Sequence, residues 1–252
     1  ERLTVWTHSQ GVFQLRDAIA GVFETAKENI TVIHKAGSGC YGHNGADDAA
    51  LDAAILAREV EGIPVKVIWS RYDEFHAAPM GAAMSTKSRA HLDQDGYITA
   101  FDVEVTSVPH SSRPGTGGTP NLRSAVLIKN SKLPAKSPDV PAMRGGGAER
   151  NAVPSYDFGP VRVKKRLVHD LPFRASALRS LGAYNNVIVN EGLIDEIAHR
   201  NGKDPLAFRI KHCVDDRSKE LLLRLDSETK KYRKNLKESQ GWGVGYARYK
   251  GI

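Results

Sequence analysis

The amino-acid sequence predicts an α/β fold of the α+β type, in which mixed sheets pack against helices. The first part of the chain alternates β-like and helical runs, and a later part shows the period-two alternation of a half-buried hairpin. Hydrophobic residues make up 40% and charged residues 26% of the 252 residues, which is ordinary for a globular protein. The chain is long enough for one large domain or two small ones with cores of their own.

Periodicity and turn-forming residues set the order of the expected elements. Those of the first part are a strand over 3–7, a helix over 12–25, a strand over 30–35, a helix over 46–60 and a strand over 65–69. Those of the later part are a hairpin of strands over 88–92 and 97–108, a strand over 162–168, a helix over 187–200, a helical region over 205–237 and a strand that begins near Trp242. The pair Asp95-Gly96 is typical of a hairpin turn.

Composition divides the chain into three parts. Residues 1–108 form a first lobe, and residues 109–150 form a connection that holds six prolines and the triplet Gly145-Gly-Gly147. A connection of this length is uncommon inside a compact domain, so it wraps a surface, covers a ligand or links two bodies. Residues 151–252 form the second part of the fold.

A glycine-rich loop lies between the expected strand over 30–35 and the helix over 46–60, with four glycines in the nine residues from Gly37 to Gly45. This density indicates either a sharp turn or a backbone that approaches a bulky ligand. The helix that follows turns unpaired N–H groups toward the loop, which suits a phosphate or another anion. The loop also fits G-x-G-x-x-G, but Asp73 lies too far along the chain for a Rossmann-type NAD dehydrogenase, which stays a remote alternative.

Four blocks of sequence, in this order, carry a more specific signal: 5–10, 37–50, 174–186 and 187–209. Together they resemble the molybdenum-binding large subunits of the xanthine dehydrogenase and aldehyde oxidase family. The loop sequence Gly-Cys-Tyr-Gly-His-Asn-Gly-Ala-Asp-Asp is most similar to the branch of isoquinoline 1-oxidoreductase beta subunits and nicotinate dehydrogenase. The resemblance implies the fold of that family's molybdopterin-binding domain, and it implies that the chain is a part of a longer subunit.

In that family a pterin dithiolene holds the metal, and no protein side chain binds the metal directly. The resemblance implies that Gln10 directs its amide toward an oxo group of the metal, because an amide donates a hydrogen bond without changing charge. It also implies that the backbone of Gly39, Cys40, Tyr41 and Gly42 passes close to the metal's other ligands. On the residues alone, a helix-opening position is the alternative for Gln10, and a small buried side chain is the alternative for Cys40.

The resemblance places three residues at the substrate. Arg179 matches an arginine that faces the substrate in several family enzymes, and its planar cation suits a carbonyl or a carboxylate such as that of nicotinate. Tyr41 is the expected successor to a phenylalanine that stacks on the substrate in many members. Leu181 replaces another frequent phenylalanine, so one aromatic wall of the substrate pocket is expected to be missing. A surface charge or helix-end charge is the alternative for Arg179.

No catalytic residue is assigned. The family's general base is a glutamate in a Gly-x-Gly-Glu segment, which residues 1–252 do not contain, so the chain alone is expected to be inactive. A non-catalytic binding or assembly module of the same fold is the alternative function. Adjacent Asp47 and Asp48 diverge on a helix and are expected to complement its dipole rather than share a proton. Glu191 and Asp195 share one face of the helix over 187–200. The resemblance implies that this helix packs in the core, so neither residue receives a chemical role.

The reaction implied by the resemblance is the hydroxylation of an N-heterocyclic aromatic compound or an aldehyde, with water as the oxygen source. Its cofactor is a molybdopterin dinucleotide with molybdenum, expected in the cytosine form. The chain has only two cysteines, too few for an iron–sulfur cluster or a structural zinc site, and no flavin is expected in it. A small 2Fe-2S subunit and either a flavin subunit or a c-type cytochrome are the expected partners.

The net charge of +7 comes largely from two basic runs, 162–166 and 230–237. A solvated face or a docking surface is favoured over nucleic-acid binding, because no nucleic-acid motif accompanies these runs. No apolar run is long enough to span a membrane, and no signal peptide is visible. A soluble protein of the cytoplasm or the periplasm is therefore expected.

Overall fold

A computed structural model describes residues 2–39, 41–43, 45–116, 120–128 and 137–249. The chain forms two compact units, each assembled from separated stretches. Unit 1 comprises Glu1–Ala83, Val108–Gly147 and Leu167–Leu181, and unit 2 comprises Met84–Ser107, Ala148–Arg166 and Gly182–Ile252. The divisions expected from composition, after residues 108 and 150, lie near two of the points where the chain passes between units. The assignment of lobes stays a prediction.

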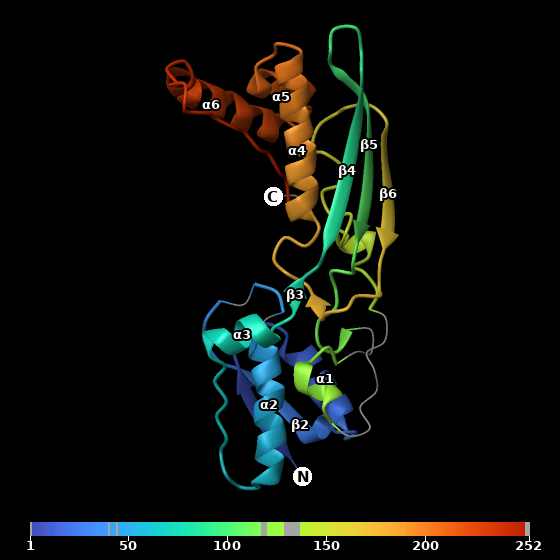
Figure 1. Ribbon diagram of the computed structural model, residues 1–252, viewed down its shortest axis with the longest axis vertical. Coiled ribbons are helices and arrows are strands. Elements are labelled where there is room, and N and C mark those ends of the chain that lie inside the picture. The colour runs from blue at the N-terminus through green and yellow to red at the C-terminus, as the bar shows by residue number, and fades with distance from the viewer. Residues whose placement is uncertain (1, 40, 44, 117–119, 129–136, 250–252) are drawn as a thin grey trace. The chain divides into compact units, whose positions relative to one another are not determined.

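Unit 1 is built on two parallel strands, β1 (Leu3–Thr7) and β2 (Ile30–His34). Helices α1 (Val12–Val22) and α2 (Gly45–Glu59) pack against them (Figure 1). Side chains of a strand alternate between its two faces, so Val5 is buried while Trp6 stays 57% exposed. The core between strands and helices includes Val5, Leu15, Ile19, Ile30, Leu51 and Leu122.

The segment after α2 differs from the prediction. The exposure of side chains alternates over 65–69 as in a strand, but no strand is assigned there among the described residues. A strand forms only where a neighbour takes up its backbone hydrogen bonds, and the sheets of unit 1 provide none for this segment. An unpredicted helix, α3 (Arg71–Ala77), follows. It begins with a capping box in which Ser70 and Asp73 each accept from the other's backbone N–H.

Two short strands complete unit 1. The strands β3 (Met80–Gly81) and β7 (Ala175–Ser176) pair in parallel. The backbone N–H of Met80 donates to the carbonyl oxygen of Arg174 at 3.0 Å, which extends this pairing by one residue. The segment that carries Arg179 is thereby attached to the stretch that follows α3.

Unit 2 combines an antiparallel sheet with helices, as the predicted fold class requires. The strands β4 (Met84–Leu92), β5 (Ile98–Ser107) and β6 (Val161–Leu167) lie in that order, and the predicted hairpin between β4 and β5 is confirmed. Gly96 has a φ of 77° in its turn. The helices are α4 (Ala183–Arg200), α5 (Pro205–His212) and α6 (Asp216–Arg233). No strand is assigned after Trp242 among the described residues, so the strand predicted there is wrong.

Helix α4 packs along β4 (Figure 1). The Thr86 hydroxyl donates to the side-chain oxygen of buried Asn186 at 2.8 Å. On another face of α4, the fully buried guanidinium of Arg209 donates to the carboxylate of Glu191 at 2.9 Å. The predicted core-packing role of this helix is confirmed, and Glu191 serves the fold. None of the described helices is both long enough and apolar enough to cross a lipid bilayer.

Candidate functional site

The glycine loop is docked on the segment that follows β7. Gly42 and Leu178 form an antiparallel bridge, and the backbone N–H of Arg179 donates to the carbonyl oxygen of Tyr41 at 2.8 Å. Gly42 has a φ of 124°, and a Cβ at this position would overlap the carbonyl oxygen of Ala177. Only glycine fits this contact, so the docking of the loop explains the requirement for Gly42.

This docking brings two of the predicted substrate residues together. The guanidinium carbon of Arg179 lies 5.7 Å from the centroid of the Tyr41 ring. The Tyr41 side chain is 61% exposed, and Arg179 is exposed as well. A planar cation beside an exposed phenol ring offers hydrogen bonds and a stacking surface to a flat, polar ligand.

Leu181, the third predicted substrate residue, closes a tight turn. Its backbone N–H donates to the carbonyl oxygen of Leu178 at 3.1 Å, and Arg179 lies inside the turn. Ser180 and Leu181 have φ values of 68° and 51°, in the left-handed region that branched side chains rarely adopt. Such conformations cost on the order of 1 kcal/mol each and accumulate at functional sites. The strained residues therefore lie directly after Arg179, inside and at the end of the turn that holds it.

Of the other predicted cofactor residues, Gly39 lies against the Tyr41 side chain, because a Cβ on Gly39 would overlap the phenol ring. Gln10 is exposed at the bend between β1 and α1. Gly39 is exposed in the glycine loop. Cys40 lies outside the described residues. The cofactor-binding roles of these three residues stay predictions.

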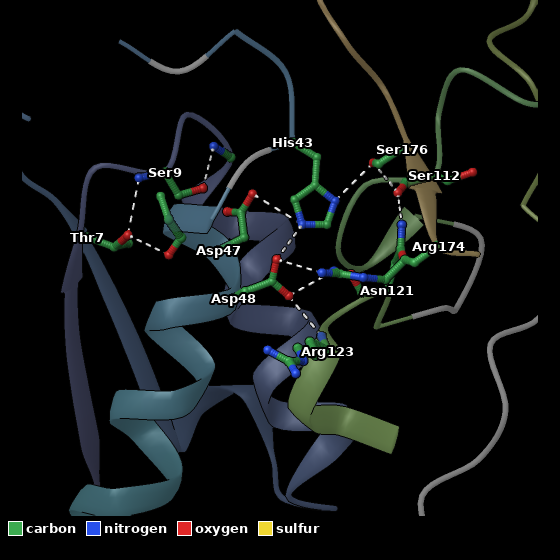
Figure 2. Close-up of polar contacts among 12 residues, drawn as sticks. Thr7, Ser9, His43, Asp47, Asp48, Ser112, Asn121, Arg123, Arg174 and Ser176 are labelled. Carbon is green, nitrogen blue, oxygen red and sulfur yellow. Dashed lines mark hydrogen bonds and ion pairs between the residues drawn. The ribbon is translucent and has the colours of Figure 1, made fainter. Parts of the chain in front are cut away.

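A buried polar cluster beside the loop joins α2 to the residue that precedes β7 (Figure 2). The guanidinium of Arg174 donates to both carboxylate oxygens of Asp48, at 2.8 and 3.0 Å. The backbone N–H of Arg123 donates to the same carboxylate at 2.8 Å, and the Asp48 side chain is 0% exposed. Arg174 also donates to the carbonyl oxygens of Asn121 and Ala77. The cluster is thus a bidentate ion pair with a fully buried carboxylate, a partly buried guanidinium and additional hydrogen bonds on both partners.

His43 completes the cluster from the end of the glycine loop (Figure 2). Its Nδ1 lies 2.9 Å from the Ser176 hydroxyl, and its Nε2 lies 3.8 and 3.7 Å from the carboxylates of Asp47 and Asp48. Nε2 is buried and has no hydrogen-bond partner in the described part of the chain. Burial, reinforced by the charge of Arg174, lowers the pKa of His43 to about 3. The imidazole is therefore neutral near pH 7.

The two aspartates lie in the first turn of α2, as predicted. Burial raises the pKa of Asp47 to about 6, against a hydrogen bond from Ser9. Burial also raises the pKa of Asp48, and the Arg174 guanidinium opposes that rise. The expectation that this end of α2 suits a phosphate stays a prediction. Two buried carboxylates lie in the first turn there, and Arg174 pairs with one of them.

Sequence reasoning missed the roles of Arg174 and His43. A basic residue between the apolar neighbours Phe173 and Ala175, together with two aspartates after a glycine loop, is the only local signal for the ion pair. His43 has no ligand spacing, and within the described ranges no group of three or more His, Cys, Asp or Glu side chains could hold a metal ion. The cluster therefore supports the loop through hydrogen bonds and charge.

Known proteins share both the sequence and the fold of this chain. Residues 1–117 match the protein family described as molybdopterin cofactor-binding domain. Over 98% of its length the chain is 32% identical to a nicotinate dehydrogenase subunit of Pseudomonas putida, of which it covers 20%. Over 97% of its length it is 23% identical to the beta subunit of isoquinoline 1-oxidoreductase of Brevundimonas diminuta, of which it covers 29%. Its fold is similar to that of aldehyde oxidoreductase from Desulfovibrio gigas, with a TM-score of 0.66 and 17% identity over 92% of this chain and 24% of that one.

The chain spans less than a third of the length of each of these proteins. The block at 5–10 and the glycine loop both fall inside the matched residues 1–117. The resemblance read from four blocks of sequence is confirmed, and so is the fold class. The chain belongs to the molybdopterin-binding large subunits of the xanthine dehydrogenase and aldehyde oxidase family.

Proposed function

We propose that this chain is part of the large subunit of a molybdenum hydroxylase. Such an enzyme is an oxidoreductase that hydroxylates an N-heterocyclic aromatic compound or an aldehyde with oxygen taken from water. The observation that carries the proposal is the contact between Tyr41 and Arg179, on a chain that matches the molybdopterin cofactor-binding family. Two relatives are named for nicotinate and isoquinoline, which are both aromatic nitrogen heterocycles.

Three residues form the proposed substrate contacts. Tyr41 offers an exposed ring for stacking on a flat substrate. Arg179 binds a carbonyl or carboxylate of the substrate, and no carboxylate of the described residues pairs with its guanidinium. Leu181 leaves the pocket with one aliphatic wall in place of an aromatic one. These properties favour a planar, polar substrate, and a carboxylated heterocycle most of all.

The proposed cofactor is a molybdopterin dinucleotide in the cytosine form. When bound, it supplies the metal centre that accepts two electrons and transfers oxygen. The exposed stretch 35–39 fits one side of such a group, because it contains Lys35 and two glycines and no carboxylate. Gln10, Gly39, Cys40, Tyr41 and Gly42 are the proposed contacts. The dinucleotide phosphates are not proposed at the start of α2, where the buried carboxylates lie.

Electrons leave the proposed enzyme through other subunits. The two cysteines cannot hold an iron–sulfur cluster, which usually takes four such ligands. The nicotinate dehydrogenase and isoquinoline 1-oxidoreductase relatives are themselves named as subunits, and so are components of assemblies. A small 2Fe-2S subunit is the proposed first acceptor, followed by a flavin subunit or a c-type cytochrome.

The test uses the full-length gene product, purified together with its co-expressed partner subunits. We expect molybdenum and a released cytosine nucleotide in amounts equal to the protein. We also expect labelled oxygen from water in the hydroxylated product of nicotinate, isoquinoline or benzaldehyde. A full-length protein that contains neither molybdenum nor nucleotide and oxidises none of these compounds overturns the proposal. That outcome favours the alternative, a non-catalytic binding or assembly module.

A further inference from the structure

An open groove in unit 1 separates β1 from the segment that follows α2. Its volume is 680 Å³, and it is lined mainly by β1, by one face of α2 and by the stretch 61–67, and also by Phe23, Thr25, Asn29 and Ile30. Neither Tyr41 nor Arg179 lines it, so it is separate from the proposed substrate site. Three of its walls offer contacts to a further element of chain.

The first wall is the free edge of β1. This strand has a neighbour on one side only, namely β2. The backbone N–H of Lys35 donates to the carbonyl oxygen of Thr7 at 2.8 Å, so Thr7 directs its backbone groups toward β2. Successive residues of a strand direct these groups to opposite edges, so Thr4 and Trp6 direct theirs into the groove. Neither has a backbone partner among the residues that the structure describes.

The second wall is the segment that the sequence predicts as a strand. Val65, Val67 and Trp69 are less exposed than Lys66 and Ile68 between them, which is the alternation of an extended strand. No strand pairs with this segment in the described chain. An extended segment without a neighbour and a strand with a free edge therefore face the same groove.

The third wall is the alanine face of α2. Ala49, Ala53 and Ala57 line the groove at a spacing of four residues, and all three are half-buried. Their methyl groups form a shallow apolar floor, onto which larger side chains of another element can pack. In a sheet covered by a helix, a strand packs its side chains on the helix and pairs its backbone with the neighbouring strand. The alanine face of α2 and the unpaired backbone groups of β1 offer these two contacts to a further strand.

We infer that the groove receives one extended strand of the same polypeptide, from the part of the large subunit outside residues 1–252. The chain covers only 20% of the nicotinate dehydrogenase relative, so a subunit of that size has ample chain to supply the strand. A strand as long as β1 runs about 17 Å and widens a sheet by about 4.8 Å, which agrees with a groove along the five residues of β1. The strand pairs with Thr4 and Trp6 on one side and with 65–67 on the other, and its apolar side chains cover the alanines of α2.

The test uses the full-length protein with a photo-crosslinking benzoylphenylalanine at Lys66, which is exposed and lines the groove. We expect a cross-link to a peptide of the same polypeptide that lies outside residues 1–252, in protein that stays the size of one chain. The matched control carries the same amino acid at Glu59, which is exposed on α2 but does not line the groove. No cross-link at Lys66, or one to a partner subunit or a second copy, overturns the inference.

A second measurement needs no substitution. In the full-length protein, we expect the amides of Thr4 and Trp6 to exchange with solvent as slowly as those of Val5 and Thr7, which face β2. Exchange at Thr4 and Trp6 that is faster by about tenfold or more would contradict a strand in the groove.

A matched pair of variants of the full-length protein extends this measurement. The variant Ala53→Arg places a long charged side chain in the groove and should speed exchange at Thr4 and Trp6 by about tenfold or more. Leu56→Arg changes an exposed position of α2 outside the groove and should leave exchange at both amides unchanged. Equal exchange in the two variants would count against the inference.

Discussion

Arg174 binds Asp48 across 126 positions of sequence, through hydrogen bonds of 2.8 and 3.0 Å to the two carboxylate oxygens. Asp48 lies in the first turn of α2, directly after the glycine loop, and Arg174 lies directly before β7. The ion pair therefore joins the two segments that carry Tyr41 and Arg179. The position of the proposed substrate contacts depends on a pair of residues that need not touch the substrate.

Removing one partner of this pair should be strongly destabilising. Arg174→Met leaves the Asp48 carboxylate buried without its cation, and we expect a loss of about 3 kcal/mol in the free energy of unfolding. Arg16→Met removes an exposed ion pair with Asp17 and should change that free energy by less than about 1 kcal/mol. Urea denaturation of both variants measures the difference. Equal effects would show that the Arg174 pair contributes no more than a surface contact.

The docking of the glycine loop should be sensitive to a single methyl group. Gly42→Ala introduces a Cβ that overlaps the carbonyl oxygen of Ala177, at a φ of 124°, so we expect a loss of about 2 kcal/mol or more. The control is Gly21→Ala in α1, where no heavy atom lies within 4 Å of the new Cβ. That change should stabilise the helix by about 0.5 to 1 kcal/mol. Thermal unfolding that moves in the same direction for both variants would rule out the docking as the cause.

The contributions of Asp47 and His43 to the free energy of unfolding should depend on pH in opposite directions. Folding raises the pKa of Asp47 from 3.8 to about 6, so its contribution is greatest below pH 3.8 and is lost as the pH rises to 6. Folding lowers the pKa of His43 from 6.5 to about 3, so its contribution is present above pH 6.5 and is lost as the pH falls toward 3. The two slopes offset each other between about pH 4 and 6, where we expect little net dependence from this pair.

Single substitutions should separate the pH dependence that Asp47 gives to the free energy of unfolding from the one that His43 gives. In Asp47→Asn only the histidine remains, so the free energy of unfolding should rise by up to about 1.4 kcal/mol per pH unit from pH 4 to 6. In His43→Asn only the aspartate remains, and the free energy should fall with pH over the same range. Denaturation curves at pH 4, 5 and 6 give the slopes, and the double variant is the control that should show neither. Parallel slopes in the two single variants would refute the assignment.

Arg179 should discriminate between substrates by their charge, if the proposed function holds. In the loaded, full-length enzyme, Arg179→Met removes two charge-assisted hydrogen bonds and should raise KM for a carboxylated heterocycle by about tenfold or more. KM for an uncharged heterocycle should change little. Arg71→Met, at an exposed residue paired with Glu74, serves as the matched control and should leave both values unchanged. Equal rises for both substrates would argue against a carboxylate contact.

Much of the fold could be predicted because its elements carry local patterns. The hairpin of β4 and β5 follows from period-two alternation around Asp95-Gly96, and α1 and α2 follow from apolar spacing between turn-forming residues. Helix α3 was missed although Ser70 and Asp73 have the spacing of a capping box. The prediction over 65–69 reads the local pattern correctly, but whether a strand forms depends on a neighbour that no local pattern describes.

The candidate site likewise contains residues that could be predicted from the sequence and residues that could not. Tyr41 and Arg179 could be named because a family resemblance covers their motifs, and the structure places them in contact. The pairing of Arg174 with Asp48 could not be named, because residues this far apart have no shared period or spacing. The burial that holds His43 neutral likewise arises from several elements that meet only in the folded chain.

The bridge between Gly42 and Leu178 has a consequence for how members of this family diversify. It ties together the two stretches of backbone that carry Tyr41 and Arg179, so insertions into one stretch would disturb the other. New substrate preferences are therefore expected to evolve by exchange of side chains at positions 41 and 179, on an inherited backbone of constant length. Homologues that act on different substrates should differ in the side chains at these two positions and should share the glycine at position 42.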